Sequence, residues 1–138
     1  MRILVQKFGG TSLKTRSLRE RVVTHIRKAL DKGYKVVVVV SAMGRKGDPY
    51  ATDTFLDWID HNGQGLNPRE LDLLLSCGEI ISGTTLSSML REMNIENRVF
   101  TGGQAGITTN DDFTNAQIIS VNPERLKEEL KRVPVVIV

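Results

Sequence analysis

The sequence has little of several things, and each shortage excludes a class of protein. It contains one cysteine, so no disulfide can form within the chain, and Cys77 lies in an apolar run that predicts a buried structural thiol. We find no apolar stretch of the length that spans a bilayer and no signal-peptide core. We therefore expect a cytoplasmic protein without a membrane partner.

Aromatic residues and clustered positive charge are also scarce. Aromatics make up 5% of the 138 residues, and the 19 Lys and Arg are interspersed with 16 Asp and Glu, for a net charge of +3. Nucleic-acid binding calls for a basic stripe, or for clustered arginines with stacking aromatics, so we expect no nucleic-acid partner. With 40% hydrophobic and 25% charged residues, the chain is typical of one soluble globular domain or part of one.

The two commonest phosphate-binding motifs, the Walker A run and the Gly-x-Gly-x-x-Gly fingerprint, are absent. A different pattern stands at the end of a strand predicted over residues 2–8, where Lys7 precedes a pair of glycines. Glycines let backbone N–H groups approach an anion closely, and Thr11 or Ser12 would cap a following helix whose positive end faces the same spot. The pattern predicts a polyphosphate site; the alternative is a plain turn beside a solvated lysine.

Hydrophobic periodicity predicts alternating strands and helices. Apolar residues on one face predict a helix over about residues 16–32, and the β-branched run over 35–41 predicts a strand covered on both faces. The other predicted elements are helices over about 52–61, from Pro68 to an interruption at Gly78, from Ile80 to about Asn94 and from Pro123, and strands over 98–101, 118–121 and 133–138. Between them, residues 63–67 are predicted to break the pattern.

This order predicts a three-layer α/β/α sandwich with a mostly parallel sheet. Because the last predicted strand has no covering element after it, we expect residues 1–138 to be the N-terminal portion of a larger domain. Ligands of open α/β sheets bind beyond the carboxyl ends of the strands. We predict that the first three strands end side by side, so that Lys7, Ser41 and Gly102 border one anion-accepting hollow.

Four segments resemble the ordered motifs of the aspartokinase family, in the amino-acid kinase superfamily. They are residues 7–12, 39–44, 77–82 and 101–109, and together they span essentially the whole chain. Residues 45–53 are similar to the corresponding stretch of the bacterial, monofunctional type. Four motifs in order are more specific than any one of them.

The resemblance implies ATP-dependent phosphorylation of the side-chain carboxylate of L-aspartate to 4-phospho-L-aspartate, the first step toward lysine, threonine and methionine. It implies Mg²⁺ bound mainly through ATP rather than by metal ligands on the chain, and a homo-oligomer for the complete protein. It also implies that residues 1–138 are the N-terminal part of the catalytic domain, without the nucleotide-binding half and the regulatory ACT domains, so that this part alone is inactive. The competing hypothesis is a non-catalytic binding or structural module.

When the functional residues of the family are carried over to this sequence one by one, one loop binds the ATP phosphates and several others bind aspartate. The phosphate-binding residues are Lys7, which is also the catalytic cation, Phe8, Gly9, Gly10, Thr11 and Ser12. The substrate-binding residues are Ser41, Thr52, Glu79, Gly103 and Gln104. The residue pattern alone leaves alternatives, because Thr52 would also serve as a helix N-cap and Glu79 as an acid in the first turn of a helix after Gly78.

Overall fold

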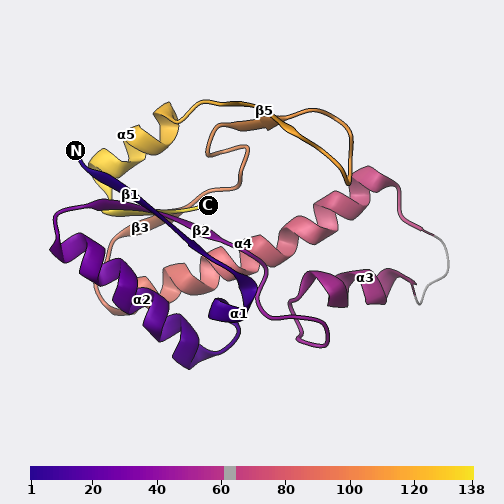
Figure 1. The fold of residues 1–138 in the computed structure, drawn as a ribbon, viewed down its shortest axis with the longest axis horizontal. Helices are drawn as coiled ribbons and strands as arrows, with labels where there is room; N and C mark the ends of the chain where they lie inside the picture. The colour runs from indigo at the N-terminus through magenta and orange to yellow at the C-terminus, as the bar shows by residue number, and fades with distance from the viewer. Residues whose placement is uncertain (61–64) are drawn as a thin grey trace.

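A parallel four-stranded sheet forms the centre of the computed structural model, which describes residues 1–60 and 65–138 (Figure 1). The strand order is β1-β2-β6-β3. The bounds are Ile3–Phe8 for β1, Lys35–Val40 for β2, Val135–Ile137 for β6 and Asn97–Val99 for β3. Since β2 is an interior strand, with Leu4 opposite Val36 on one side and Val135 on the other, its unbroken valine run is explained.

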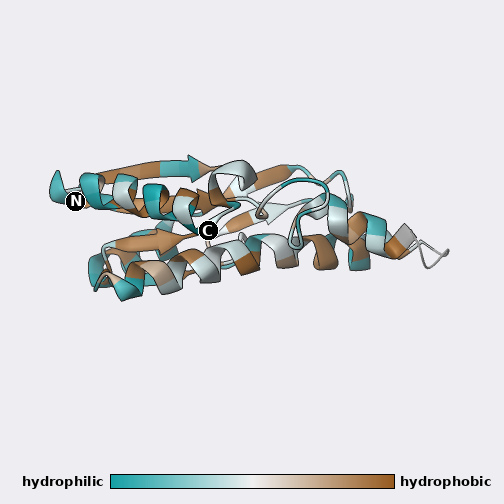
Figure 2. Cartoon of the chain, turned by 90° about the horizontal axis from the view of Figure 1, so that it is seen from below, coloured by the Kyte–Doolittle hydropathy of each residue, from teal (hydrophilic) through white to brown (hydrophobic). Residues whose placement is uncertain are grey.

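Helices cover both faces of this sheet, which confirms the predicted three layers. On one face, α2 (Arg16–Asp31) and α4 (Pro68–Glu92) pack against Val36 and Val38. On the other, Leu130 of α5 (Glu124–Arg132) packs against Val37 and Val136. Figure 2 shows how this covering is reflected in the residue types. The central strands are mostly hydrophobic, whereas the helices alternate between hydrophobic and hydrophilic residues.

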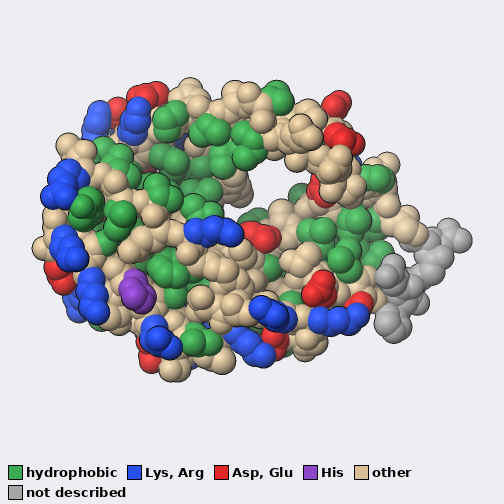
Figure 3. All heavy atoms as spheres, in the orientation of Figure 1, with side chains coloured by type: hydrophobic (Ala, Val, Ile, Leu, Met, Phe, Trp, Pro, Cys, Tyr) green, Lys and Arg blue, Asp and Glu red, His purple; other side chains and the backbone are tan. Residues whose placement is uncertain are grey.

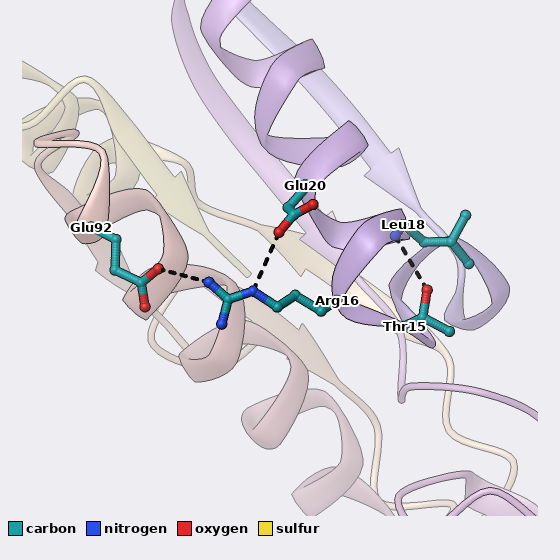
Figure 4. A network of polar contacts seen from close by, with 5 residues as sticks. All are labelled: Thr15, Arg16, Leu18, Glu20 and Glu92. Carbon is teal, nitrogen blue, oxygen red and sulfur yellow. Dashed lines mark hydrogen bonds and ion pairs between the residues drawn. The ribbon is translucent and has the colours of Figure 1, made fainter.

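The start of α2 is fixed by local polar contacts (Figure 4). The Thr15 hydroxyl accepts a hydrogen bond from the Leu18 N–H at 3.2 Å and so satisfies a free donor of the first turn. Arg16 lies between Glu20, at 3.3 Å, and Glu92, at 3.4 Å, and joins the start of α2 to the end of α4.

The prediction that Thr11 or Ser12 caps the helix after the glycine pair is wrong. Both residues lie inside a single turn, α1 (Gly10–Leu13), whose N-cap is Gly9 and which has no side-chain cap. The chain then restarts as α2 because Thr15 is extended, with φ −112° and ψ 159°, and supplies the cap there.

The predicted interruption at Gly78 is also wrong, since α4 is one helix of 25 residues. A glycine in a helix interior costs only about 1 kcal/mol relative to alanine, and here its missing side chain leaves room for a neighbour. A Cβ on Gly78 would lie 2.7 Å from the Cβ of Ala42 and 3.3 Å from the Phe55 ring. The helix start was predicted correctly, because the Asn67 side chain accepts from the Arg69 N–H at 3.0 Å.

Cys77 is exposed, which corrects the expectation of a buried thiol. Gly78 faces the loop after β2. Cys77, one position away in the helix, points about 100° round the helix axis, so its side chain cannot pack against the same loop.

By its length and composition α4 could also cross a membrane, although the sequence analysis found no apolar stretch long enough to do so. Leu86 and Leu90 in it are fully buried against the sheet, and core helices of this length commonly meet the same criterion.

The remaining elements lie outside the central sheet. The predicted strand β5 (Ile118–Val121) is confirmed, but it pairs antiparallel with β4 (Ile107–Thr109), which sequence patterns missed, in a separate two-stranded sheet. The helix α3 (Thr52–Asp60) follows the β2 loop, as predicted. Its predicted end at His61, and the predicted break at Gly63, lie outside the described residues.

Candidate functional site

All four central strands point the same way, so their carboxyl ends share one edge of the sheet. Phe8 pairs with Val40, and the loops after β1 and β2 therefore leave as neighbours. The prediction that the first three strands lie side by side needs correction, since β6 is inserted between β2 and β3. Neighbouring strands lie about 4.8 Å apart, which places the end of β3 roughly 10 Å from that of β2.

The loops after β1 and β2 touch backbone to backbone. The Gly44 N–H donates to the carbonyl oxygen of Gly10 at 3.0 Å. A Cβ on Gly10 would lie 2.3 Å from the carbonyl oxygen of Ala42 and 2.8 Å from that of Gly44. Gly10 is therefore required by this close approach, and the predicted phosphate loop is held directly against the loop that leads to Thr52.

Glu79 joins the same loop from α4. Its Oε1 accepts a hydrogen bond from the Ala42 N–H at 3.1 Å, which fixes one end of the carboxylate. Because Glu79 lies in the interior of α4, the alternative role of a first-turn acid is wrong. An anionic group is thus held where α4 meets the end of β2.

A cavity of 610 Å³ opens beside Glu79. In Figure 3 the face toward the viewer is hollowed near its centre, and the cavity itself lies between α4, the ends of β2 and β3 and the loop after β3. Its polar lining comes from Ser76, Glu79, Thr84, Thr101 and Gln104, and its apolar lining from Val39, Val40, Ile80, Val99, Phe100 and Val138, with Gly83 and Gly102 between them.

The third loop folds back on itself at the rim of this cavity. The Gln104 Oε1 accepts from the Thr101 N–H at 3.0 Å, and the Gln104 N–H donates to the Thr101 hydroxyl at 3.3 Å. Of the predicted substrate-binding residues, Glu79 and Gln104 line the cavity. Ser41, which follows β2, Thr52, the first residue of α3, and Gly103, an exposed turn residue, do not.

Lys7 does not line the cavity but lies on the strand next to it. It pairs in register with Val39, which lines the cavity, and paired residues of neighbouring strands project from the same face of a sheet. The Lys7 side chain is exposed, and within the part of the chain that the structure describes it has no hydrogen bond or ion pair. A cation is thus available at the predicted phosphate position.

The other residues of the predicted phosphate loop differ in orientation. The side chains of Phe8 and Ser12 line a separate cavity of 190 Å³ with α2, on the opposite face of β1 from Lys7. Thr11 is exposed, and a Cβ on Gly9 would meet nothing within 4 Å. The Ser12 N–H donates to the carbonyl oxygen of Gly9 at 2.9 Å, so it is not a free donor for a phosphate oxygen.

The comparisons with known proteins agree with this geometry. Residues 2–138 match the model of the amino acid kinase family. The chain belongs to this family.

Relatives of this amino acid kinase chain include aspartokinase 1 of Bacillus subtilis strain 168, 56% identical over 126 residues, which are 91% of this chain and 31% of the relative. The aspartokinase of Mycobacterium tuberculosis strain H37Rv is 40% identical over 138 residues, 100% of this chain and 32% of the relative. The chain thus spans about a third of the length of the curated relatives it matches.

Solved structures of aspartate kinases share the fold. The aspartate kinase of Synechocystis superposes with a TM-score of 0.78 at 36% identity, over 99% of this chain and 21% of that one. Aspartokinase III of E. coli, solved with lysine and aspartate, gives 0.73 at 18% identity over 99% of this chain and 40% of that one. The amino-acid kinase fold expected from the sequence is confirmed.

Sequence patterns missed two features of this site in the amino acid kinase chain. One is the Ala42 N–H that holds Glu79. The sequence carries no sign of this role, because every residue except proline has a backbone donor. The other is Asp48, whose carboxylate joins the β2 loop to Lys14. The glycines at 44 and 47, both with positive φ, were the available sign that this loop folds tightly.

Proposed function

We propose that the protein carrying this chain is an aspartokinase. It transfers the γ-phosphoryl group of ATP to the side-chain carboxylate of L-aspartate and forms 4-phospho-L-aspartate, the first step of lysine, threonine and methionine biosynthesis, in the cytoplasm. The observation that supports the proposal is a fixed carboxylate, Glu79, in the lining of a cavity at the carboxyl edge of the sheet, with Lys7 on β1 opposite Val39, which lines the same cavity. The relatives named aspartokinase support the choice of substrate.

The chemistry suits such a site because a carboxylate nucleophile is already ionised at neutral pH and needs no general base. The remaining barrier is repulsion between two anions, together with their alignment, and phosphoryl transfer is catalysed mainly by positioning and charge stabilisation. Lys7 offsets this repulsion from the end of β1. The N–H groups of Gly9 and Gly10, with those of Phe8 and Thr11, are the proposed partners of the phosphate oxygens. The Ser12 N–H is not among them, because it donates to the Gly9 carbonyl oxygen at 2.9 Å.

Mg²⁺ reaches the site on the nucleotide in this proposal. Residues 1–60 and 65–138 contain no group of three or more His, Cys, Asp or Glu side chains that could hold a metal ion. When bound, the ion neutralises phosphate charge. The chain's own share of this task is the Lys7 ammonium.

Glu79 is the proposed partner of the substrate ammonium. An acid beside an anionic substrate is unfavourable unless it pairs with a positive group, and aspartate carries one. The Ala42 N–H fixes the Glu79 carboxylate, so its position is set before the substrate arrives. Ser41, Thr52, Gly103 and Gln104 are the proposed further contacts of aspartate.

Residues 1–138 form, in this proposal, the N-terminal part of the catalytic domain of a homo-oligomer. The nucleotide-binding half and the ACT domains are proposed to lie in the remainder of the complete protein, since this chain spans about a third of the length of its relatives. We accordingly expect the isolated 138 residues to bind ATP weakly and to turn over little. Calorimetric titration with ATP tests this expectation, and complete absence of binding would favour a non-catalytic module.

A coupled ADP-release assay on the complete protein tests the function. Aspartate should support turnover, whereas glutamate, acetylglutamate and carbamate should not. Lys7→Ala should lower kcat by about 10²- to 10³-fold, as for other preorganised electrostatic groups. Lys127→Ala on α5, which removes a lysine distant from the cavity, is the control. Undiminished activity in Lys7→Ala would rule out the phosphate assignment.

A second variant tests the ammonium contact. Glu79→Gln keeps an oxygen for the Ala42 N–H but loses the charge, so the loop stays in place while recognition of the ammonium weakens. We expect KM for aspartate to rise at least tenfold with little change in KM for ATP. An unchanged KM for aspartate would remove Glu79 from substrate recognition.

A further inference from the structure

Asp48 joins two loops of the site through one oxygen atom. Its Oδ2 accepts a hydrogen bond from the Arg45 N–H at 2.9 Å and lies 3.2 Å from the Nζ of Lys14, the residue that follows α1. The Arg45 N–H, and after it Lys14, hold the pKa of Asp48 below its ordinary value. The carboxylate is thus stabilised in its charged form between the β2 loop and the end of the phosphate loop.

The loop is folded tightly around this side chain. Gly44 has φ +88°, and a Cβ on it would lie 2.6 Å from both the Cβ and the Oδ2 of Asp48. The same Gly44 donates to the Gly10 carbonyl oxygen. The Lys14 ion pair therefore connects Asp48 to the end of the phosphate loop, and the Gly44–Gly10 hydrogen bond connects the neighbouring part of the β2 loop to it.

The backbone of Asp48 reaches the other side of the site. Its carbonyl oxygen accepts from the Thr54 hydroxyl at 2.7 Å and from the Ala51 N–H at 3.2 Å. These contacts fix the start of α3, where Thr52 lies. One residue thus has its side chain on the phosphate loop and its carbonyl group on the helix that carries a proposed aspartate contact.

We propose that Asp48 is a positioning residue that holds the phosphate loop and the start of α3 at a fixed separation, so that ATP and aspartate meet in the geometry for transfer. The inference rests on the proposed aspartokinase function. A misplacement of about 1 Å can cost on the order of 10²-fold in rate. By contrast, an ion pair whose side chains are 50% and 25% exposed adds little to folding stability. The pair should therefore matter more for alignment than for folding stability.

The test uses steady-state kinetics of the complete protein. Asp48→Ala should lower kcat about tenfold or more and change KM for ATP less than twofold. Lys14→Met should lower kcat by a smaller factor, and the double variant should be no worse than Asp48→Ala, because both changes break one link. Asp48→Asn, which keeps an acceptor for the Arg45 N–H, should recover part of the loss.

Glu128→Ala is the matched control. Glu128 pairs with Lys131 at 2.6 Å on α5, and that hydrogen bond holds the pKa of Glu128 low, as at Asp48, but away from the cavity. The kcat of Glu128→Ala should equal that of the wild type. Thermal melting of every variant checks folding, and a variant that melts below the assay temperature is replaced in the comparison by Lys14→Met, which removes only a surface partner.

The outcomes separate this inference from the proposed function. If folded Asp48→Ala and Lys14→Met keep kcat within twofold of the wild type while Lys7→Ala is inactive, the positioning role is wrong and the kinase assignment stands. If Lys7→Ala is also fully active, the kinase site itself is misassigned. A loss of kcat in a folded Lys14→Met, absent in Glu128→Ala, supports the inference.

Discussion

Replacing Gly10 by alanine tests the contact between the first two loops. The added Cβ would lie 2.3 Å and 2.8 Å from the carbonyl oxygens of Ala42 and Gly44, and backbone atoms cannot rotate away as a side-chain end can. Overpacking of this kind costs about 1–3 kcal/mol, and the rigid partners favour about 3. Alanine regains up to about 1 kcal/mol in a helical position, so we expect a net loss of about 2 kcal/mol.

Urea unfolding followed by circular dichroism measures this loss. The midpoint of Gly10→Ala should fall while the m-value stays constant, because the surface exposed on unfolding does not change. Gly9→Ala is the matched control: Gly9 has φ −74°, and its Cβ would meet nothing within 4 Å. Equal midpoints for the two variants would show that the loops do not touch as described.

Three further predictions concern stability. Thr15→Ala removes the cap of α2 and should cost about 1 kcal/mol in urea unfolding. Ser82→Ala should stabilise by about 1 kcal/mol in the same assay, because the Ser82 hydroxyl is fully buried and unpartnered among the described residues; a loss would mean that it has a partner. A lowered pKa means that the folded state binds the proton more weakly, so the stability from Asp48 should be present above about pH 4 and be lost below it. The urea midpoints of wild type and Asp48→Asn should therefore converge as the pH falls from 6 to 3.

The sequence predicted those elements whose signal is local. The valine run of β2 and the apolar face of α2 depend on nearby residues, and both elements form at the predicted positions within a residue or two. The reason for a glycine inside α4 is instead non-local, because a Cβ on Gly78 would lie 2.7 Å from the Cβ of Ala42, which is far away in the sequence. A glycine that breaks a pattern locally is here the residue that allows two elements to meet.

The residues of the candidate site likewise fall into those with a local sequence signal and those without one. Lys7 and Glu79 are charged residues of recognisable motifs; Glu79 lines the cavity, and Lys7 lies opposite Val39, which lines it too. The roles of Ala42 and Asp48 come from backbone geometry and from the fold of a loop, which no residue type specifies by itself. Roles of this kind become visible only when the strands and α4 are placed together.

The position of β6 also determines when the sheet can be completed during synthesis. Within the central sheet β3 pairs only with β6, so residues 97–99 lack a neighbouring strand until residues 135–137 have left the ribosome. Until then β1 and β2 are the only paired strands of the central sheet, and the edge that β6 will occupy stays open to other chains. Pausing of translation between these two segments would prolong that exposure and favour aggregation.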